Sequence, residues 1–193
     1  MTQSVRKLVG DMMKSLKFIS TVLLTASVLS LSGCGKTSIA EEYSFGNATL
    51  RAGNTQLMLF TPFDLVSETI KGTDRTVYGN QDAHVSVVVT YDPATGLTLD
   101  KAADNAIAEL SGHSEITITG KETKAAVVEG SKGKICTVDY TLTAKGQQVA
   151  VVEQILVFEH EGYIWTVRYT YRQDDETAKE VTDYIFKRFG NQY

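Results

Sequence analysis

The chain has 193 residues, of which 42% are hydrophobic and 22% charged, and this composition excludes a largely disordered protein. Residues 1–33 hold four of the 19 basic side chains and one of the 23 acidic ones, so the rest of the chain carries 15 basic and 22 acidic side chains, a net charge of −7. Such a domain gains no counterion-release attraction for nucleic acid, so we expect no nucleic-acid partner.

An export signal is predicted at the start of the chain. Lys14 and Lys17 precede an apolar run of 14 residues from Phe18 to Leu31. A helix needs about 20 residues to cross the hydrocarbon core of a bilayer, so this run is too short to span one. A basic region, a short apolar region and small residues are typical of a secretory signal peptide, and a buried N-terminal helix is the alternative. The start of translation stays open among Met1, Met12 and Met13.

The segment Leu31-Ser32-Gly33-Cys34, at the end of this run, resembles the lipobox of bacterial lipoproteins. The resemblance implies that residues 1–33 are removed and that Cys34 is lipidated, with acyl chains such as palmitate. Two or three acyl chains anchor a protein stably where one is marginal. The bilayer is then a partner through Cys34, and the protein lies on the cell membrane or outer membrane, facing away from the cytoplasm. A buried cysteine at this position is the alternative.

The second cysteine, Cys136, alternates with apolar residues on a predicted strand and is interpreted as a small core residue. Residues 34–55 are assigned to the lipidated cysteine and a tether, and residues 56–193 to a single α+β domain. In that domain a strand at 56–61 should end before Pro62, which cannot donate to a ladder. Residues 64–73 are expected to loop, and two strands follow at 75–78 and 83–91.

A helix over 99–110 is predicted next, capped by Thr98 and stopped at Gly112. Strands at 115–119 (continued at 125–128), 134–143, 147–159 and 163–171 are joined by short glycine-containing loops, which indicates antiparallel hairpins. A final helix follows the acidic run at 174–176, whose charge suits a helix N-terminus better than a cation site. Its apolar stripe is Ala178, Val181, Ile185 and Phe189, and Gly190 should stop it.

This order of elements predicts an α+β fold in which amphipathic helices flank an antiparallel sheet. Over residues 56–189 it resembles the PsbP/Mog1-like domains of bacterial lipoproteins. The resemblance depends on Thr61-Pro62-Phe63 after the early strand, on the helix at 99–110, and on Gly162-Tyr163-Ile164-Trp165 leading towards the last helix. Because that family has no shared catalytic residues, the resemblance implies a non-catalytic binding or accessory role.

The sequence has no recognised catalytic, nucleotide-binding or metal-binding motif, so we expect neither an enzyme nor a cofactor or metal. The three histidines are far apart and are interpreted as surface residues. Tyr163, Trp165 and Tyr169 share one strand face; core filling under a helix is favoured, and a ligand pocket is the alternative. Two functions remain open: a membrane-anchored envelope lipoprotein that binds an envelope protein or a small ligand, and an envelope enzyme with an unrecognised active site.

Overall fold

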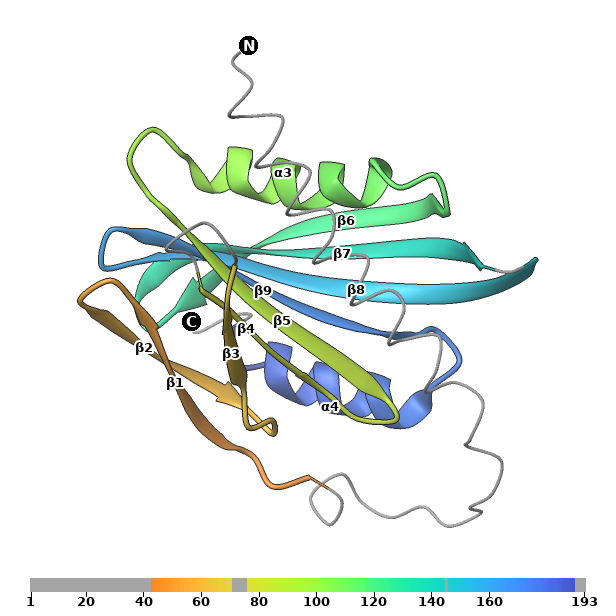
Figure 1. Ribbon diagram of the computed structural model, residues 1–193, viewed down its shortest axis with the longest axis horizontal. Coiled ribbons are helices and arrows are strands. Elements are labelled where there is room, and N and C mark those ends of the chain that lie inside the picture. Colours follow the sequence, from red (N-terminus) through yellow and green to blue (C-terminus); the bar gives the residue numbers. More distant parts are fainter. Residues whose placement is uncertain (1–42, 71–75, 145, 190–193) are drawn as a thin grey trace.

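The computed structural model describes residues 43–70, 76–144 and 146–189, so the predicted signal peptide, Cys34 and Gly190 lie outside the described residues. A seven-stranded antiparallel sheet forms the centre of the domain, in the spatial order β3-β4-β5-β9-β8-β7-β6 (Figure 1). Its strands are β3 (Val66–Thr69), β4 (Thr76–Gln81), β5 (Val85–Pro93), β6 (Ile116–Val128), β7 (Ser131–Ala144), β8 (Gln147–His160) and β9 (Tyr163–Arg172).

The four strands β6 to β9 form the predicted meander, each pairing antiparallel with the next. Two of its connections are tight turns, Glu129-Gly130 and Glu161-Gly162. Both residues of each turn have positive φ, at 49° and 82° in the first and 49° and 79° in the second. Type I′ turns require positive φ at both central residues, because only then does the turn match the twist of the strands.

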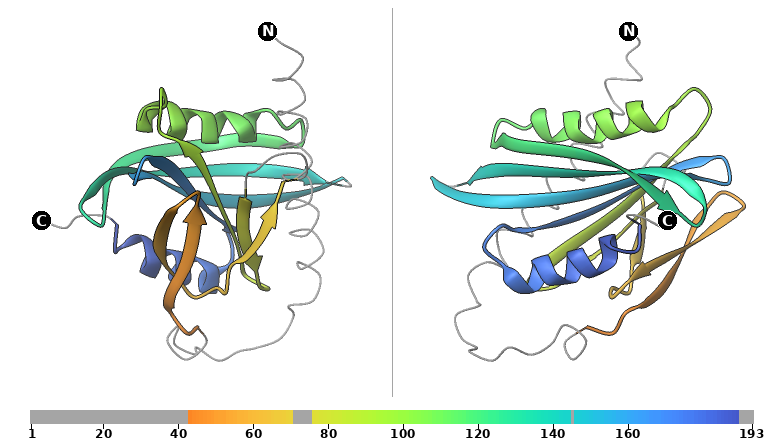
Figure 2. Two further views of the ribbon diagram at one scale, coloured as in Figure 1. Left: turned by 60° about the vertical axis from the view of Figure 1, so that its left-hand side comes forward. Right: turned by 180° about the vertical axis from the view of Figure 1, so that it is seen from behind.

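Two helices cover opposite faces of the sheet (Figure 2). Helix α3 (Leu99–Ser111) packs on β6 to β9, and helix α4 (Glu176–Phe186) lies on the other side. Each face has its own apolar core: Cys136 and Ile155 belong to the α3 side, Leu156 and Trp165 to the α4 side. This alternation confirms the α+β prediction, since neighbouring residues of one strand point to opposite faces.

Helix α3 begins and ends close to the predicted positions. The Thr98 side chain accepts a hydrogen bond from the Lys101 N–H, as an N-cap does. Ala102, Ala106 and Leu110 are buried against the sheet.

Helix α4 ends one turn earlier than the sequence predicted. Ala178, Val181 and Ile185 are fully buried, as expected. Phe189, the last residue of the predicted stripe, lies beyond the helix, although it still packs against the same core. Its backbone carbonyl accepts a hydrogen bond from the Val127 N–H at 3.0 Å, so the chain leaves the helix to pair with the end of β6.

A separate two-stranded hairpin, β1 (Gly46–Ala52) and β2 (Thr55–Thr61), lies on the same side of the sheet as α4 (Figure 2). Strand β1 falls within residues 34–55, which the sequence had assigned to the tether, so the folded domain begins earlier than predicted. The inward positions of β1 are held mainly by alanine, which gives a weak hydrophobic signal. Leu50 nevertheless pairs with Leu57, and both are buried.

The turn of this hairpin needs a glycine. Gly53 has φ +57°, and a Cβ at this position would lie 2.7 Å from the Tyr163 hydroxyl oxygen. Glycine therefore allows both the left-handed backbone and the close approach of the hairpin to β9.

Two other segments differ from the prediction. Residues 64–73 were expected to loop, but Val66–Thr69 form the edge strand β3, paired with β4. All four residues are exposed, so the strand has no hydrophobic alternation to reveal it. The second difference is that β6 also includes residues 120–124, which join the two predicted parts of this strand. A register shift between Ile118 and Gly120 moves its even-numbered residues from the α3 core to the α4 core, where Ala126 lies.

Candidate functional site

The aromatic residues named as a candidate pocket lie in and around the α4-side core. Trp165 and Tyr169 are 0% and 1% exposed, and Tyr163 is half-buried at the edge of the same core. The Tyr169 hydroxyl donates to the Thr61 hydroxyl oxygen at 3.0 Å, and burial raises the pKa of Tyr169. The Tyr163 ring meets the Tyr91 ring edge-on, with 5.5 Å between centroids. This arrangement agrees with the core-filling interpretation.

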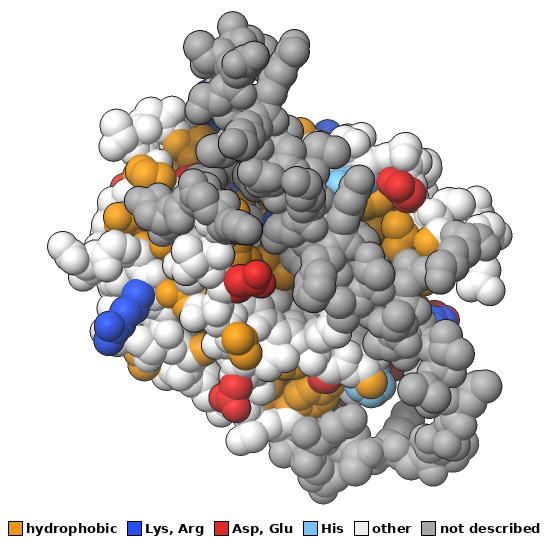
Figure 3. All heavy atoms as spheres, in the orientation of Figure 1, with side chains coloured by type: hydrophobic (Ala, Val, Ile, Leu, Met, Phe, Trp, Pro, Cys, Tyr) orange, Lys and Arg blue, Asp and Glu red, His pale blue; other side chains and the backbone are white. Residues whose placement is uncertain are grey.

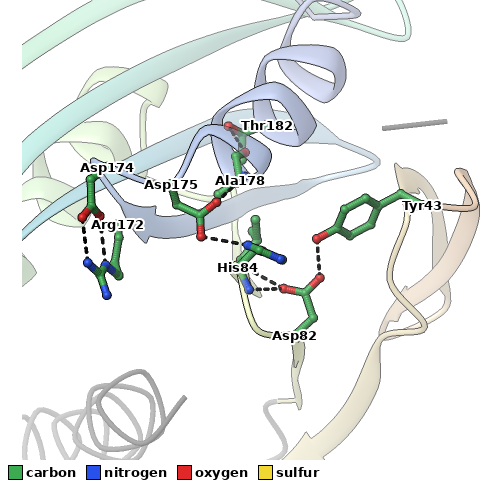
Figure 4. A network of polar contacts seen from close by, with 9 residues as sticks. Tyr43, Asp82, His84, Arg172, Asp174, Asp175, Ala178 and Thr182 are labelled. Carbon is green, nitrogen blue, oxygen red and sulfur yellow. Dashed lines mark hydrogen bonds and ion pairs between the residues drawn. The ribbon is translucent and has the colours of Figure 1, made fainter. Parts of the chain in front are cut away.

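A polar network joins the β4–β5 turn, helix α4 and the residues that precede β1 (Figure 4). His84 Nδ1 lies 2.8 Å from a carboxylate oxygen of Asp175, whose other oxygen caps α4 at the Ala178 N–H. Asp82 accepts hydrogen bonds from the backbone N–H groups of His84 and Val85 and from the Tyr43 hydroxyl at 2.7 Å. The network therefore ties the start of the folded domain to the N-terminus of α4.

The other two histidines lie elsewhere, as the sequence indicated. His160 Nε2 is 3.1 Å from the Gln56 carbonyl oxygen, which links β8 to the hairpin. His113 follows α3, and its N–H donates to the Leu110 carbonyl. Within residues 43–70, 76–144 and 146–189, no group of three or more His, Cys, Asp and Glu side chains is arranged to hold a metal ion.

The acidic run before α4 has structural partners. Asp174 accepts two hydrogen bonds from the Arg172 guanidinium, at 2.7 and 2.9 Å, and this contact lowers the pKa of Asp174. Asp175 is the N-cap of α4. The helix-terminal interpretation therefore holds for Asp175, whereas Asp174 pairs with Arg172.

A buried charge cluster under α3 was not predicted. Arg168 on β9 donates through Nη1 to Glu153 on β8 at 3.0 Å and through Nη2 to Glu109 on α3. Glu153 is 4% exposed and Arg168 8%. Burial raises the pKa of Glu153, while the charge and the hydrogen bond of Arg168 oppose the rise. In the sequence, the cluster could have been suspected only from Glu153, the single acid in the apolar run 149–158. Its partner Arg168 lies on another strand, so the sequence does not show that the two meet.

A partly exposed apolar surface lies where β1–β2 meets α4. We call it the aromatic ledge and define it as Phe45, Met58, Phe60, Tyr184 and Arg188. The Phe45 ring stacks on Phe60 at 5.7 Å and lies 4.6 Å from Tyr184, measured between centroids. The Arg188 guanidinium carbon lies 3.5 Å from the Phe60 centroid. Met58 and Tyr184 are 45% and 44% exposed, which is high for such large apolar side chains.

Cys136 is fully buried, as predicted, and accepts a hydrogen bond from the Thr123 hydroxyl. Burial also raises the pKa of its thiol, so the reactive thiolate is disfavoured. We expect Cys136 in the native protein to react with Ellman's reagent only when the domain is unfolded by urea. Cys136→Ala should keep the fold at a cost of about 1 kcal/mol, as a small core truncation does. Rapid labelling without urea would contradict this assignment.

In sequence, no family model and no curated protein matches the chain. Among solved structures it resembles CyanoP, the cyanobacterial PsbP of Synechocystis sp. PCC 6803, with a TM-score of 0.50 and 16% identity over 82% of this chain and 97% of that one. The seven-stranded sheet with two helices is therefore a PsbP-like fold, as the sequence predicted.

Two other solved structures are similar at lower scores. LpqN of Mycobacterium tuberculosis, involved in cell envelope biogenesis, has a TM-score of 0.45 and 14% identity, covering 79% of this chain and 96% of its own. PA94 of Pseudomonas aeruginosa, a protein of unknown function, has a TM-score of 0.39 and 10% identity, covering 67% and 85%. Fold does not determine function, so these likenesses describe the architecture alone.

Proposed function

We propose that this chain is an envelope lipoprotein, anchored through acylated Cys34, whose PsbP-like domain is a non-catalytic binding or accessory module for an envelope protein or a small ligand. The observation that supports it most is the order of features along the chain. The basic region, the short apolar run and Leu31-Ser32-Gly33-Cys34, which resembles a lipobox, come first, and the described domain begins nine residues after Cys34, at Tyr43. Nine residues span at most about 30 Å, so this spacing suits a short tether between lipid and domain.

The two cysteines support the same assignment. The chain has only Cys34 and Cys136, and Cys136 is buried at 0% exposure. A modifying enzyme needs access to the thiol it acylates, so Cys34 is the cysteine available for lipid attachment. No helix in the described part of the chain is long and apolar enough to cross a membrane.

The non-catalytic assignment is favoured by what the reactive side chains do. The ion pairs of Arg168 with Glu153 and Glu109 join the sheet to α3. The contact of the His160 ring with the Gln56 carbonyl joins β8 to the hairpin. Each of these contacts holds two or more elements together. These side chains therefore have a structural role, and no catalytic role is needed to explain their contacts.

An envelope enzyme is the alternative, and the His84–Asp175 pair is the arrangement that favours it. A histidine oriented by a carboxylate at 2.8 Å is also what serine and cysteine hydrolases use as a base. Here, however, Asp175 also caps α4, so the pair has a structural role. We therefore assign the domain to binding.

Growth of cells that express the full chain with tritiated palmitate tests the anchor. Wild-type protein should carry the label and migrate as the cleaved form. Cys34→Ser should lose the label and accumulate as precursor, because the acylated sulfur is absent and the lipoprotein peptidase does not cleave an unmodified chain. Cys136→Ala is the matched control and should label like wild type. A Cys34→Ser protein that still incorporates palmitate would refute the assignment.

A further inference from the structure

We infer that the aromatic ledge is a second membrane contact, which holds the hairpin and α4 against the phospholipid surface. The inference deepens the proposed function and depends on the lipid anchor at Cys34. Three observations lead to it: the composition of the ledge, its position relative to the tether, and the absence of acidic residues from the adjoining hairpin sequence.

The composition of the ledge suits the interfacial region of a bilayer. Tyr184, Phe45 and Phe60 offer apolar rings at a partly exposed surface, and Met58 adds a flexible apolar chain on the outer face of the hairpin. Tyrosine and tryptophan concentrate at the level of the lipid headgroups, and phenylalanine adds apolar area that an interfacial surface buries. Arg188, whose guanidinium lies over the Phe60 ring, can reach phosphate groups while its stem covers apolar surface.

The tether brings this surface to the membrane. The described chain begins at Tyr43, whose ring lies 6.3 Å from the ring of Phe45, so the tether ends beside the ledge. Helix α3, in contrast, lies across the sheet from the hairpin (Figure 2). Once Cys34 is in the bilayer, a ledge–lipid contact is intramolecular, and a weak contact is populated at the high effective concentration that a short linker provides.

The charge distribution favours the same orientation. The domain after residue 33 has a net charge of −7, yet residues 43–63 contain Arg51 and no acidic residue. Glu42 and Asp64 are the acids that flank this stretch in sequence. Glu180 and Asp183 precede Tyr184 on α4, and Lys187 and Arg188 follow it, so the charges of residues 180–188 balance. The face seen in Figure 3 exposes hydrophobic side chains among polar ones, with acidic side chains and few basic ones. Because the hairpin sequence itself has no acidic residue, an anionic lipid surface meets little repulsion from it.

A tryptophan reporter tests this contact in the mature, acylated protein reconstituted into phosphatidylcholine–phosphatidylglycerol vesicles. Tyr184→Trp places an indole on the ledge, and the native Trp165 is a constant background because it is fully buried. Ala108→Trp is the matched control, since Ala108 is exposed on α3, across the sheet. We expect the indole at 184 to shift its emission to shorter wavelength in vesicles and to be quenched by brominated phosphatidylcholine, while the indole at 108 shows neither change.

The outcomes separate the two proposals. Protein that sediments with vesicles without quenching at 184 would overturn the ledge contact and leave the anchor in place. Equal quenching at 184 and 108 would also overturn it, because no face would then be preferred. Protein that is not acylated and does not sediment would refute the anchor itself. Met58→Trp is a second reporter, placed on the hairpin, for the case in which substitution at 184 disturbs the packing of α4. Its indole should show the same shift to shorter wavelength and the same quenching.

Discussion

Arg168→Met is expected to lower the free energy of unfolding by about 3–5 kcal/mol, because it leaves a buried carboxylate without its cation. Glu153 is 4% exposed, so water cannot replace the guanidinium it loses. Arg172→Met is the matched control. Arg172 sits four residues further along the chain and pairs with Asp174 at the surface, where ion pairs are worth about 0–1 kcal/mol. Urea unfolding of the two variants measures the difference.

The same variant should show a distinctive pH dependence. Burial raises the pKa of Glu153 above its ordinary value of 4.5, and Arg168 limits the rise. A carboxyl with a raised folded-state pKa binds its proton more tightly when folded, so stability is lost as the pH rises from 4.5 through the folded-state pKa. Without Arg168 that pKa rises further. The deficit of Arg168→Met should therefore be larger at neutral pH than at pH 4.5.

A second variant separates charge from packing. Glu153→Leu combined with Arg168→Met replaces the buried pair by apolar side chains, a change that is often neutral or stabilising. We expect the double variant to recover most of the stability lost by Arg168→Met alone. If Arg168→Met cost no more than Arg172→Met at neutral pH, the cluster would not hold the sheet and α3 together.

The strands and helices that sequence alone identified are those whose periodicity is carried by large apolar residues. Strand β9 alternates Trp165, Val167 and Tyr169 inward, and all three are buried. Helix α3 was recognised from its stripe and from Thr98, a residue that caps locally and so needs no tertiary information. The fold class followed from these elements and the short loops between them.

The segments that were missed lack such a local signal. Strand β1 buries Ala52 where a strand with a clear hydrophobic pattern would show a larger residue, and β3 has four exposed residues. The early end of α4 depends on a hydrogen bond from Val127 to Phe189, two residues 62 positions apart. Contacts of this kind are decided by the assembled sheet, which the local sequence does not describe.

The candidate sites differ in the same way. Cys34 belongs to a contiguous motif, so the sequence alone is enough to propose it; it lies outside the described residues. The charge cluster brings together Glu109, Glu153 and Arg168 from three elements, and only the fold places them in contact. The aromatic ledge joins Phe45 from the predicted tether to Tyr184 from the last helix. Neither the charge cluster nor the aromatic ledge follows a regular residue spacing, so neither could be recognised from the sequence.

Trp165→Ala is expected to lower the free energy of unfolding by about 3–5 kcal/mol, because it leaves a large cavity in the α4-side core. The indole is 0% exposed and lies 5.1 Å from the Tyr91 ring between centroids. Tyr184→Ala is the matched control: its ring is 44% exposed, and aromatic pairs such as Phe45–Tyr184 contribute about 0.5–1.5 kcal/mol beyond burial. Urea unfolding compares the two, and equal losses would reopen the pocket interpretation of Trp165.

Trp165→Phe should cost much less than Trp165→Ala. It keeps an aromatic ring in the core and removes the indole N–H, which is buried without a hydrogen-bond partner among the described residues. An unsatisfied buried donor costs about 1–3 kcal/mol, so its removal offsets part of the lost volume. The same urea series measures this variant. If Trp165→Phe were as damaging as Trp165→Ala, the indole nitrogen would have a partner in solution, and the site around Trp165 would have to include a polar group that binds it.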